Sequence, residues 1–191
     1  MKKLLVKKIL ERPLGHDWSL QGFGMLRLYL SKEVRLHVWH SSKAVPNVSL
    51  IHTHPWHFDS EVIVGQIVNV RYVVSDNYPG RGFTPHQYAK ILCGVGGGMA
   101  KGELKEERGV KPLTELHHEV YRERDSYWQT ADEIHKSIPT DGTVTVVTRK
   151  PLPDPDHALV FWEKGDWVSA EPRKATDDEV TAYCEAALKL F

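Results

Sequence analysis

The chain has 191 residues, and its 25 Lys and Arg are balanced by 25 Asp and Glu, so the formal net charge is zero. This length suits one domain with a sizeable core. Without a basic field to hold a polyanion, we expect no nucleic-acid partner. No apolar run approaches the roughly 20 residues of a membrane span, so we expect no membrane partner either. Two cysteines, Cys93 and Cys184, form no disulfide framework, which favours a cytoplasmic protein.

Taken in chain order, residues 1–23 hold at most a short helix, and short strands follow. The strict period-2 alternation of residues 34–40 is the clearest strand signal. Apolar or β-branched runs of this kind, bounded by turn residues, predict strands at 25–30, 34–40, 48–54, 61–64, 66–74, 87–93, 113–121, 133–138, 143–148, 158–162 and 166–169. Gly65 and the pair Asp141-Gly142 are predicted to be hairpin turns.

The last element is predicted to be a helix over residues 176–191. Thr176 and Glu179 have the spacing of a capping box, and an apolar face repeats at helical spacing after them. The glycine-rich residues 94–109 are expected to form a mobile connection. About ten strands with no crossover helices predict an antiparallel all-β barrel or sandwich, and they argue against a parallel α/β sheet.

Two of the 11 histidines, His52 and His54, lie two residues apart on a predicted strand. Side chains at i and i+2 point to the same face, so the two imidazoles project together. A pair of neutral imidazoles can hold a divalent metal. The alternative is a pair of core or rim histidines that bond to the backbone.

The surrounding residues decide between these readings. Residues 52–65, HTHPWHFDSEVIVG, resemble the first motif of the cupin superfamily, and residues 125–135, DSYWQTADEIH, followed by 142–147, GTVTVV, resemble the second. The Pro-Trp after the H-x-H also resembles a group of small bacterial and phage cupins. The resemblance implies a cupin-type double-stranded β-helix, or jelly-roll barrel, over about residues 25–170 of a single domain, with the C-terminal helix outside it.

The resemblance also implies the ligands of a metal. His52, His54 and His135 match the superfamily's metal-binding histidines, and the ion would be a divalent transition metal, iron foremost, with Zn, Ni or Mn as alternatives. The superfamily's glutamate ligand lies about seven residues before the turn glycine, where this chain has Phe58. Asp59, one place away, is the candidate fourth ligand, although its parity on a regular strand faces it outward. A set of three histidines is similar to that of the thiol dioxygenases.

Five further residues are candidates for lining a substrate pocket beside the metal. The alternatives without a functional role are a solvent-exposed arginine and aromatic rings that only fill the barrel. The candidates are His37, Trp56, Phe58, Arg71 and Trp128.

The resemblance implies a metal-dependent enzyme acting on a small molecule, with dioxygenase chemistry foremost and an isomerase or lyase as alternatives. The contrasting hypothesis is a non-catalytic binding module, metal-free or with a structural metal, which the missing glutamate favours. Three neutral ligands leave the metal's full charge in place, which favours an anionic or chelating substrate. The resemblance further implies a homodimer.

Overall fold

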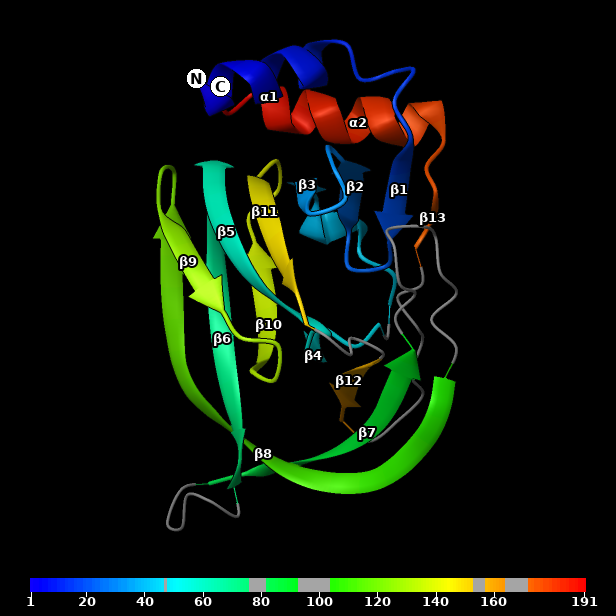
Figure 1. Ribbon diagram of the computed structural model, residues 1–191, viewed down its shortest axis with the longest axis vertical. Helices are drawn as coiled ribbons and strands as arrows, with labels where there is room; N and C mark the ends of the chain where they lie inside the picture. The colour runs from blue at the N-terminus through cyan, green and yellow to red at the C-terminus, as the bar shows by residue number, and fades with distance from the viewer. Residues whose placement is uncertain (47, 76–81, 93–103, 153–156, 164–171) are drawn as a thin grey trace.

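The described residues of the protein form two antiparallel β-sheets and two α-helices (Figure 1). The computed structural model describes residues 1–46, 48–75, 82–92, 104–152, 157–163 and 172–191. The helices are α1 (Lys2–Glu11) and α2 (Asp177–Leu188), with a 3₁₀ turn at Ser41–Lys43. Neither α-helix of the described residues has the length and apolar character that crossing a membrane requires.

One sheet is open and the other closes on itself. The open sheet has the order β13 (Arg173–Lys174), β1 (Trp18–Gln21), β2 (Met25–Tyr29), β3 (Val34–Trp39), β11 (Val144–Pro151), β5 (Trp56–Val64) and β9 (Ser126–Gln129). The closed sheet has the order β10 (Ile134–Pro139), β4 (Ile51–His52), β12 (His157–Trp162), β7 (Thr84–Leu92), β8 (Leu104–Arg122) and β6 (Gln66–Val74). We call them the open sheet and the barrel sheet.

Strands from the second half of the chain are inserted between strands of the first half in both sheets. In the open sheet β11 lies between β3 and β5, and in the barrel sheet β10 and β12 flank β4. Every strand pair in both sheets is antiparallel. This interleaving is the arrangement of a jelly roll. The predicted fold class, an all-β jelly roll with a C-terminal helix, is confirmed.

The two helices cover the outer face of the open sheet, where they lie side by side with both chain ends close together (Figure 1). Alternate residues of β2, β3 and β11 point toward them and form one buried apolar cluster with α1 and α2. Its members from the strands are Trp18, Leu26, Leu28, Leu36, Val38, Ile63, Val64, Val144 and Val146, and those from the helices are Val6, Leu10, Val180, Tyr183, Cys184 and Ala187. Each large side chain buried there contributes about 1.5–3 kcal/mol. The other face of the open sheet is turned toward the barrel sheet.

Helix α2 begins as the sequence predicts. The Thr176 hydroxyl accepts a hydrogen bond from the Glu179 amide, and the Glu179 carboxylate accepts one from the Thr176 amide. Such a cap contributes about 1 kcal/mol. Cys184 is a buried free thiol on the apolar face of this helix.

The two predicted hairpin turns are instead corners between the sheets. Gly65 joins β5 of the open sheet to β6 of the barrel sheet, and Asp141-Gly142 joins β10 of the barrel sheet to β11 of the open sheet. Gly65 has φ +84°, and a Cβ there would lie 2.5 Å from Thr143 Oγ1. The residue types at both places predict a turn correctly, but a local sequence signal cannot tell whether the flanking strands pair or diverge.

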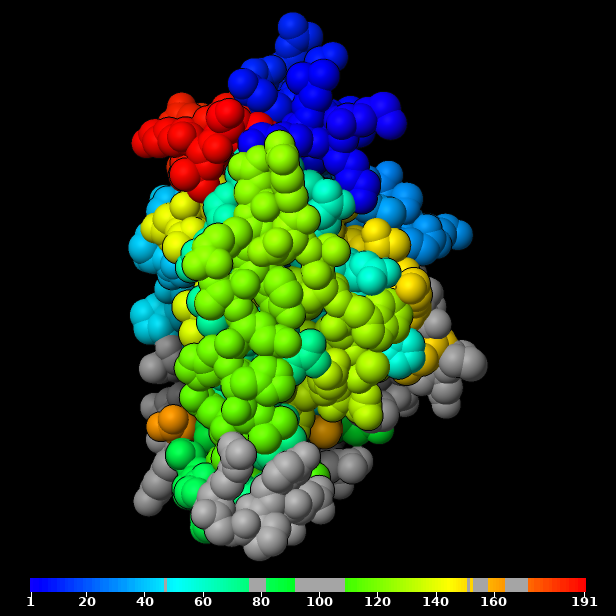
Figure 2. All heavy atoms as spheres, turned by 90° about the vertical axis from the view of Figure 1, so that its left-hand side faces the viewer, coloured from blue at the N-terminus to red at the C-terminus, as the bar shows by residue number. Residues whose placement is uncertain are grey.

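Several strand boundaries also differ from the prediction. Strand β5 begins at Trp56 rather than at residue 61, and β4 has only two residues. Strand β8 begins at Leu104, inside the segment expected to be a connection, and it curves along one side of the molecule (Figures 1 and 2). The short strands β1, β9 and β13 were not predicted. Residues 94–103 of the expected connection and the predicted strand at 166–169 lie outside the described residues.

Candidate metal centre

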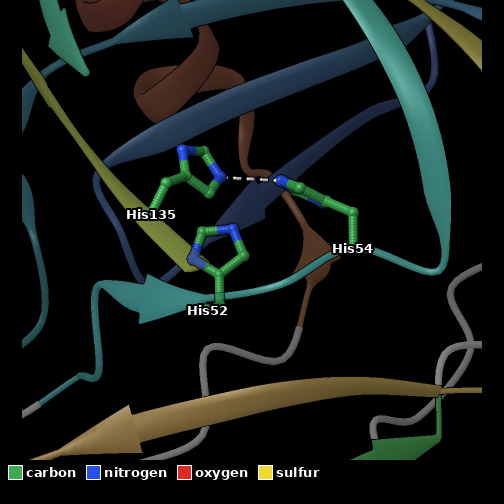
Figure 3. A group of neighbouring side chains, drawn as sticks. All are labelled: His52, His54 and His135. Carbon is green, nitrogen blue, oxygen red and sulfur yellow. Dashed lines mark hydrogen bonds between the residues drawn. The ribbon is translucent and has the colours of Figure 1, made fainter. Parts of the chain in front are cut away.

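Three histidines from two distant parts of the chain converge between the two sheets. His52 ends β4, His54 lies two residues beyond it, and His135 is the second residue of β10. Strands β4 and β10 pair so that His52 and His135 are directly opposite. One candidate ligand atom from each residue lies within 4.8 Å of the other two, and the rings face one another (Figure 3). The structure therefore brings together the three histidines that the sequence singled out.

The spacing of two of the nitrogens fits a shared ion. Nε2 of His54 lies 3.0 Å from Nε2 of His135. Two nitrogens that each lie about 2.1 Å from one ion, at a right angle, are about 3.0 Å apart. In the metal-free protein one of the two imidazoles must donate a proton to the other across this distance.

Hydrogen bonds to the opposite ring nitrogens leave lone pairs for a metal. Nδ1 of His135 donates to Oδ1 of Asn69 at 2.7 Å, and Nδ1 of His52 donates to the Leu50 carbonyl at 2.9 Å. Nε2 of both rings is then the unprotonated nitrogen. Asn69 is itself held, because its Nδ2 donates to Oε1 of the fully buried Gln129 at 3.1 Å. Metal-binding histidines are typically oriented by such a second layer.

Burial keeps the three imidazoles neutral. Desolvation lowers the pKa of His52, and desolvation together with the neighbouring histidines lowers the pKa of His54 and of His135 well below the usual value. A metal ligand must be unprotonated, and neutral imidazoles need no net loss of a proton to bind at neutral pH, although Nε2 of His54 has to pass its proton to Nδ1.

Two aromatic rings of β5 lie beside the three histidines. The buried Phe58 ring lies with its centroid 5.0 Å from that of His54 and 6.2 Å from that of His135. The Trp56 ring centroid is 4.3 Å from that of His54. Within the described residues, no carboxylate or cysteine joins the three-histidine group (His52, His54 and His135).

Asp59 is on the opposite side of β5 from the site. Its neighbours Phe58 and Ser60 are buried, whereas Asp59 is exposed, and its carboxylate lies 3.3 Å from Nζ of Lys150. The strand is regular at this point, in register with β9 and β11, so no bulge turns Asp59 inward. The structure does not bring this candidate fourth ligand to the histidines.

The five candidate pocket residues fall into two groups. Trp56 and Phe58 contact His54, and the buried His37 lies on the inner face of the open sheet, edge-on to Trp39. Arg71 and Trp128 are placed differently.

Arg71 is held in ion pairs with Glu119 and Glu133, so its charge is already matched within the protein. The Trp128 side chain is exposed, and Nζ of Lys150 lies 4.1 Å from the centroid of its ring. Trp128 lies beside His57, with 5.6 Å between the ring centroids, whereas the backbone of Arg71 is directly opposite that of His135 in the β6–β10 pair.

Sequence reasoning missed the second layer of the site. Asn69 lies in a run of β-branched residues, and a polar residue on the inward parity of such a strand is a signal that could have identified it. Gln129 carries no comparable signal, because only the pairing of β9 with β5 opposite Phe58 turns it inward.

Comparison with known proteins adds little to this geometry. A scan against protein-family models and a search of curated proteins each found no match. Among solved structures, the chain is similar to hydroquinone 1,2-dioxygenase from Sphingomonas sp. TTNP3 with 4-hydroxybenzoate bound, at 15% sequence identity and a TM-score of 0.22. That match covers 73% of this chain and 64% of the dioxygenase chain. At such a TM-score the two chains do not superpose closely, so the geometry of the site has to carry the functional conclusion.

Proposed function

We propose that the protein is a metal-dependent enzyme of the cupin type that acts on a small molecule, with oxidation by dioxygen as the reaction. His52, His54 and His135 would hold the ion, iron foremost, and Zn, Ni or Mn would suit the same donors. The observation that carries the proposal is the convergence of three neutral imidazoles, two of which have Nε2 freed by hydrogen bonds at Nδ1.

Each part of the site has a role in this proposal. A bound divalent ion with only three protein ligands keeps open positions for substrate, and it supplies Lewis acidity and, in the case of iron, redox chemistry. Asn69 fixes the His135 ring and its tautomer. Trp56 and Phe58 cover one side of the imidazoles with apolar surface and keep water from it.

The second candidate is a non-catalytic cupin module that works without a metal. The observation that favours it is the buried Phe58 ring beside His54, at the position that the resemblance aligns with the superfamily's glutamate ligand. In this reading the imidazoles form a hydrogen-bonded cluster through the contact of His54 with His135. A metal-dependent isomerase or lyase would use the same ligands as the oxygenase. We further propose a cytoplasmic protein that works as a homodimer.

Metal analysis and oxygen uptake together separate these candidates. The protein is purified without chelators, its metal content is measured, and oxygen consumption is followed with candidate thiols and keto acids. The proposal expects close to one transition metal ion per chain and substrate-dependent oxygen uptake in wild type, with both lost in His54→Ala. A metal without oxygen uptake favours the isomerase or lyase. No metal, and no binding of added Fe(II), Ni(II) or Zn(II), contradicts the proposal.

A further inference from the structure

Three arginines gather on the inner face of the open sheet, beside the three-histidine group. Arg27 is on β2, Arg35 on β3 and Arg149 on β11. Arg27 is opposite His37 across the β2–β3 pair, and His37 is two residues from Arg35 on β3. All therefore share one face of the sheet, the face turned away from the helices.

The three guanidinium groups surround one tyrosine. Their Cζ atoms lie 5.0 Å (Arg27), 4.7 Å (Arg35) and 5.4 Å (Arg149) from the centroid of the Tyr29 ring. Nη2 of Arg35 donates to the Tyr29 hydroxyl at 2.6 Å, and Nε of Arg27 donates to Ser19 Oγ at 3.1 Å. We call these residues the arginine cluster (Arg27, Arg35 and Arg149).

Nothing among the described residues neutralises this charge. No member of the arginine cluster forms an ion pair with a described carboxylate, although Arg27 is only 5% exposed and the other two are half-buried. Burial, with the neighbouring guanidinium groups adding to it, lowers the pKa of Arg35 to about 9. Charges that are buried or half-buried are normally paired, so three cations on one face without a carboxylate partner in the described part of the chain are unusual.

Polar atoms in the same place also lack partners. Nε of Arg35, Nε of Arg149 and Nε2 of His37 are buried and have no hydrogen-bond partner within the described part of the protein. A buried N–H without an acceptor costs about 1–3 kcal/mol. Contacts with the faces of Tyr29 and Trp56 offset part of the charge, but an aromatic face does not accept the in-plane N–H of a guanidinium.

A bound anion would neutralise the charge of the arginine cluster and accept hydrogen bonds from its free N–H groups. We propose that the arginine cluster binds a carboxylate or phosphate group of the substrate. Oxyanions of this kind accept paired hydrogen bonds from the planar guanidinium fork, and they bring the negative charge that the cluster lacks.

Trp56 connects this subsite to the candidate metal centre. The Cζ of Arg35 lies 5.0 Å from the centroid of the Trp56 ring, and the centroid of the His54 ring lies 4.3 Å from the same point. A small molecule with its anionic group at the arginine cluster can therefore extend along Trp56 to the imidazoles. This inference rests on the proposed function for the role of the substrate end that reaches the imidazoles. It defines the substrate as a small organic acid or phosphate ester.

Thermal unfolding with two probe anions tests the subsite. The unfolding midpoint of the protein is measured against inorganic phosphate and against acetate, with sodium chloride keeping the ionic strength constant. We expect the unfolding midpoint to rise with at least one probe anion until it saturates. In Arg35→Gln and in Arg149→Gln, half-saturation should need at least a ten-fold higher anion concentration. Arg35→Lys keeps the charge but loses the planar guanidinium fork, so its half-saturating concentration should lie between those of the Gln variants and that of wild type. A response to phosphate alone or to acetate alone identifies the group.

Two controls separate the possible explanations. Arg124→Gln removes the same charge from a side chain that is 91% exposed, and it should leave the response unchanged. His52→Ala should lose metal binding but keep the anion response, so a failure of the metal proposal is distinguishable from a failure of the subsite. The proposal is overturned if neither probe exceeds chloride, or if Arg124→Gln weakens the response as much as Arg35→Gln does.

Discussion

Nε2 of His54 and Nε2 of His135 lie 3.0 Å apart, although 81 positions separate the two residues in the chain. The contact depends on the register between β4 and β10, in which His135 is opposite His52. A slip of one residue in β10 would turn His135 to the other face of the sheet. The candidate site is therefore created by strand pairing rather than by a local motif, and its consequences can be tested residue by residue.

Removing any one imidazole should abolish tight metal binding. We expect His52→Ala, His54→Ala and His135→Ala each to weaken the affinity by at least about 100-fold, more than the loss of a second-layer partner. Asp59→Ala should change it less than two-fold, because the Asp59 carboxylate faces Lys150 on the outer side of β5. Calorimetric titration with Ni(II) or Zn(II) measures all four. Equal losses in Asp59→Ala and His54→Ala would show that Asp59 is a ligand after all.

Phe58→Glu should strengthen the metal site while weakening the fold without metal. The Phe58 ring borders His54 and His135, so a glutamate there places a carboxylate beside the open side of the three-histidine group. We expect at least a ten-fold gain in metal affinity. Without metal, burying the carboxylate should destabilise the protein by about 3 kcal/mol or more.

Phe58→Gln is the matched control for this substitution. It has the same size and shape as the glutamate but no charge, so it should lose stability without gaining affinity. Comparison of unfolding midpoints with and without metal measures both effects. If Phe58→Glu binds metal no better than Phe58→Gln does, Phe58 does not occupy a ligand position.

Asn69 should matter through His135 rather than through direct contact with a metal. Asn69→Leu removes the acceptor that holds the proton on Nδ1, so the His135 ring loses its fixed tautomer, and we expect metal affinity to fall about 10–100-fold. Asn69→Asp keeps an acceptor at that place and should retain at least wild-type affinity. Metal titration of the two variants provides the comparison, and similar losses in both would contradict the assigned role.

Two glycines with the same backbone conformation should respond differently to alanine. Gly65 and Gly15 have φ of +84° and +89°, but a Cβ at Gly65 would meet the Cα of Thr143 at 2.8 Å, whereas nothing lies within 4 Å at Gly15. Both variants carry about 1 kcal/mol of backbone strain. Gly65→Ala should lose about 1–3 kcal/mol more from overpacking. Denaturant unfolding measures the difference, and equal losses would mean that the corner relaxes freely.

Acid should remove the stabilisation that Glu179 gives to α2. The hydrogen bonds from Arg173 lower the pKa of Glu179 to about 2, from an ordinary value of 4.5. A lowered folded-state pKa means that the contribution is complete above pH 4.5 and is lost as the pH falls toward 2.

Glu179→Gln keeps an acceptor for the cap but removes the charge. Because this ion pair is mostly exposed, we expect its unfolding midpoint at pH 7 to be lower than that of wild type by only about 1–3 °C. The gap should close between pH 4.5 and pH 2. Thermal scans across that range check it, and a gap that persists at pH 2 would show that charge is not the cause.

The sequence carried most of the secondary structure. Alternation of apolar and polar residues located β2 and β3, a β-branched run located β6, and the capping box located the start of α2. These patterns report local burial and local hydrogen bonding, which neighbouring residues largely decide. The same patterns failed at Gly65 and Asp141-Gly142, where the direction of the chain after the turn depends on which distant strand the next segment joins.

In the candidate site, too, some features follow from the sequence and others depend on the tertiary structure. The sequence by itself identified His52, His54 and His135, because an H-x-H on a strand fixes two imidazoles on one face and the resemblance of the later segment supplied the third. Strand parity also predicted that Asp59 faces outward, and the structure confirms this with the carboxylate beside Lys150. Only the tertiary structure packed Phe58 against His54 and paired Arg71 with two glutamates. Only the tertiary structure gathered the arginine cluster, since register between β2, β3 and β11 is set by long-range packing that no short window of sequence contains.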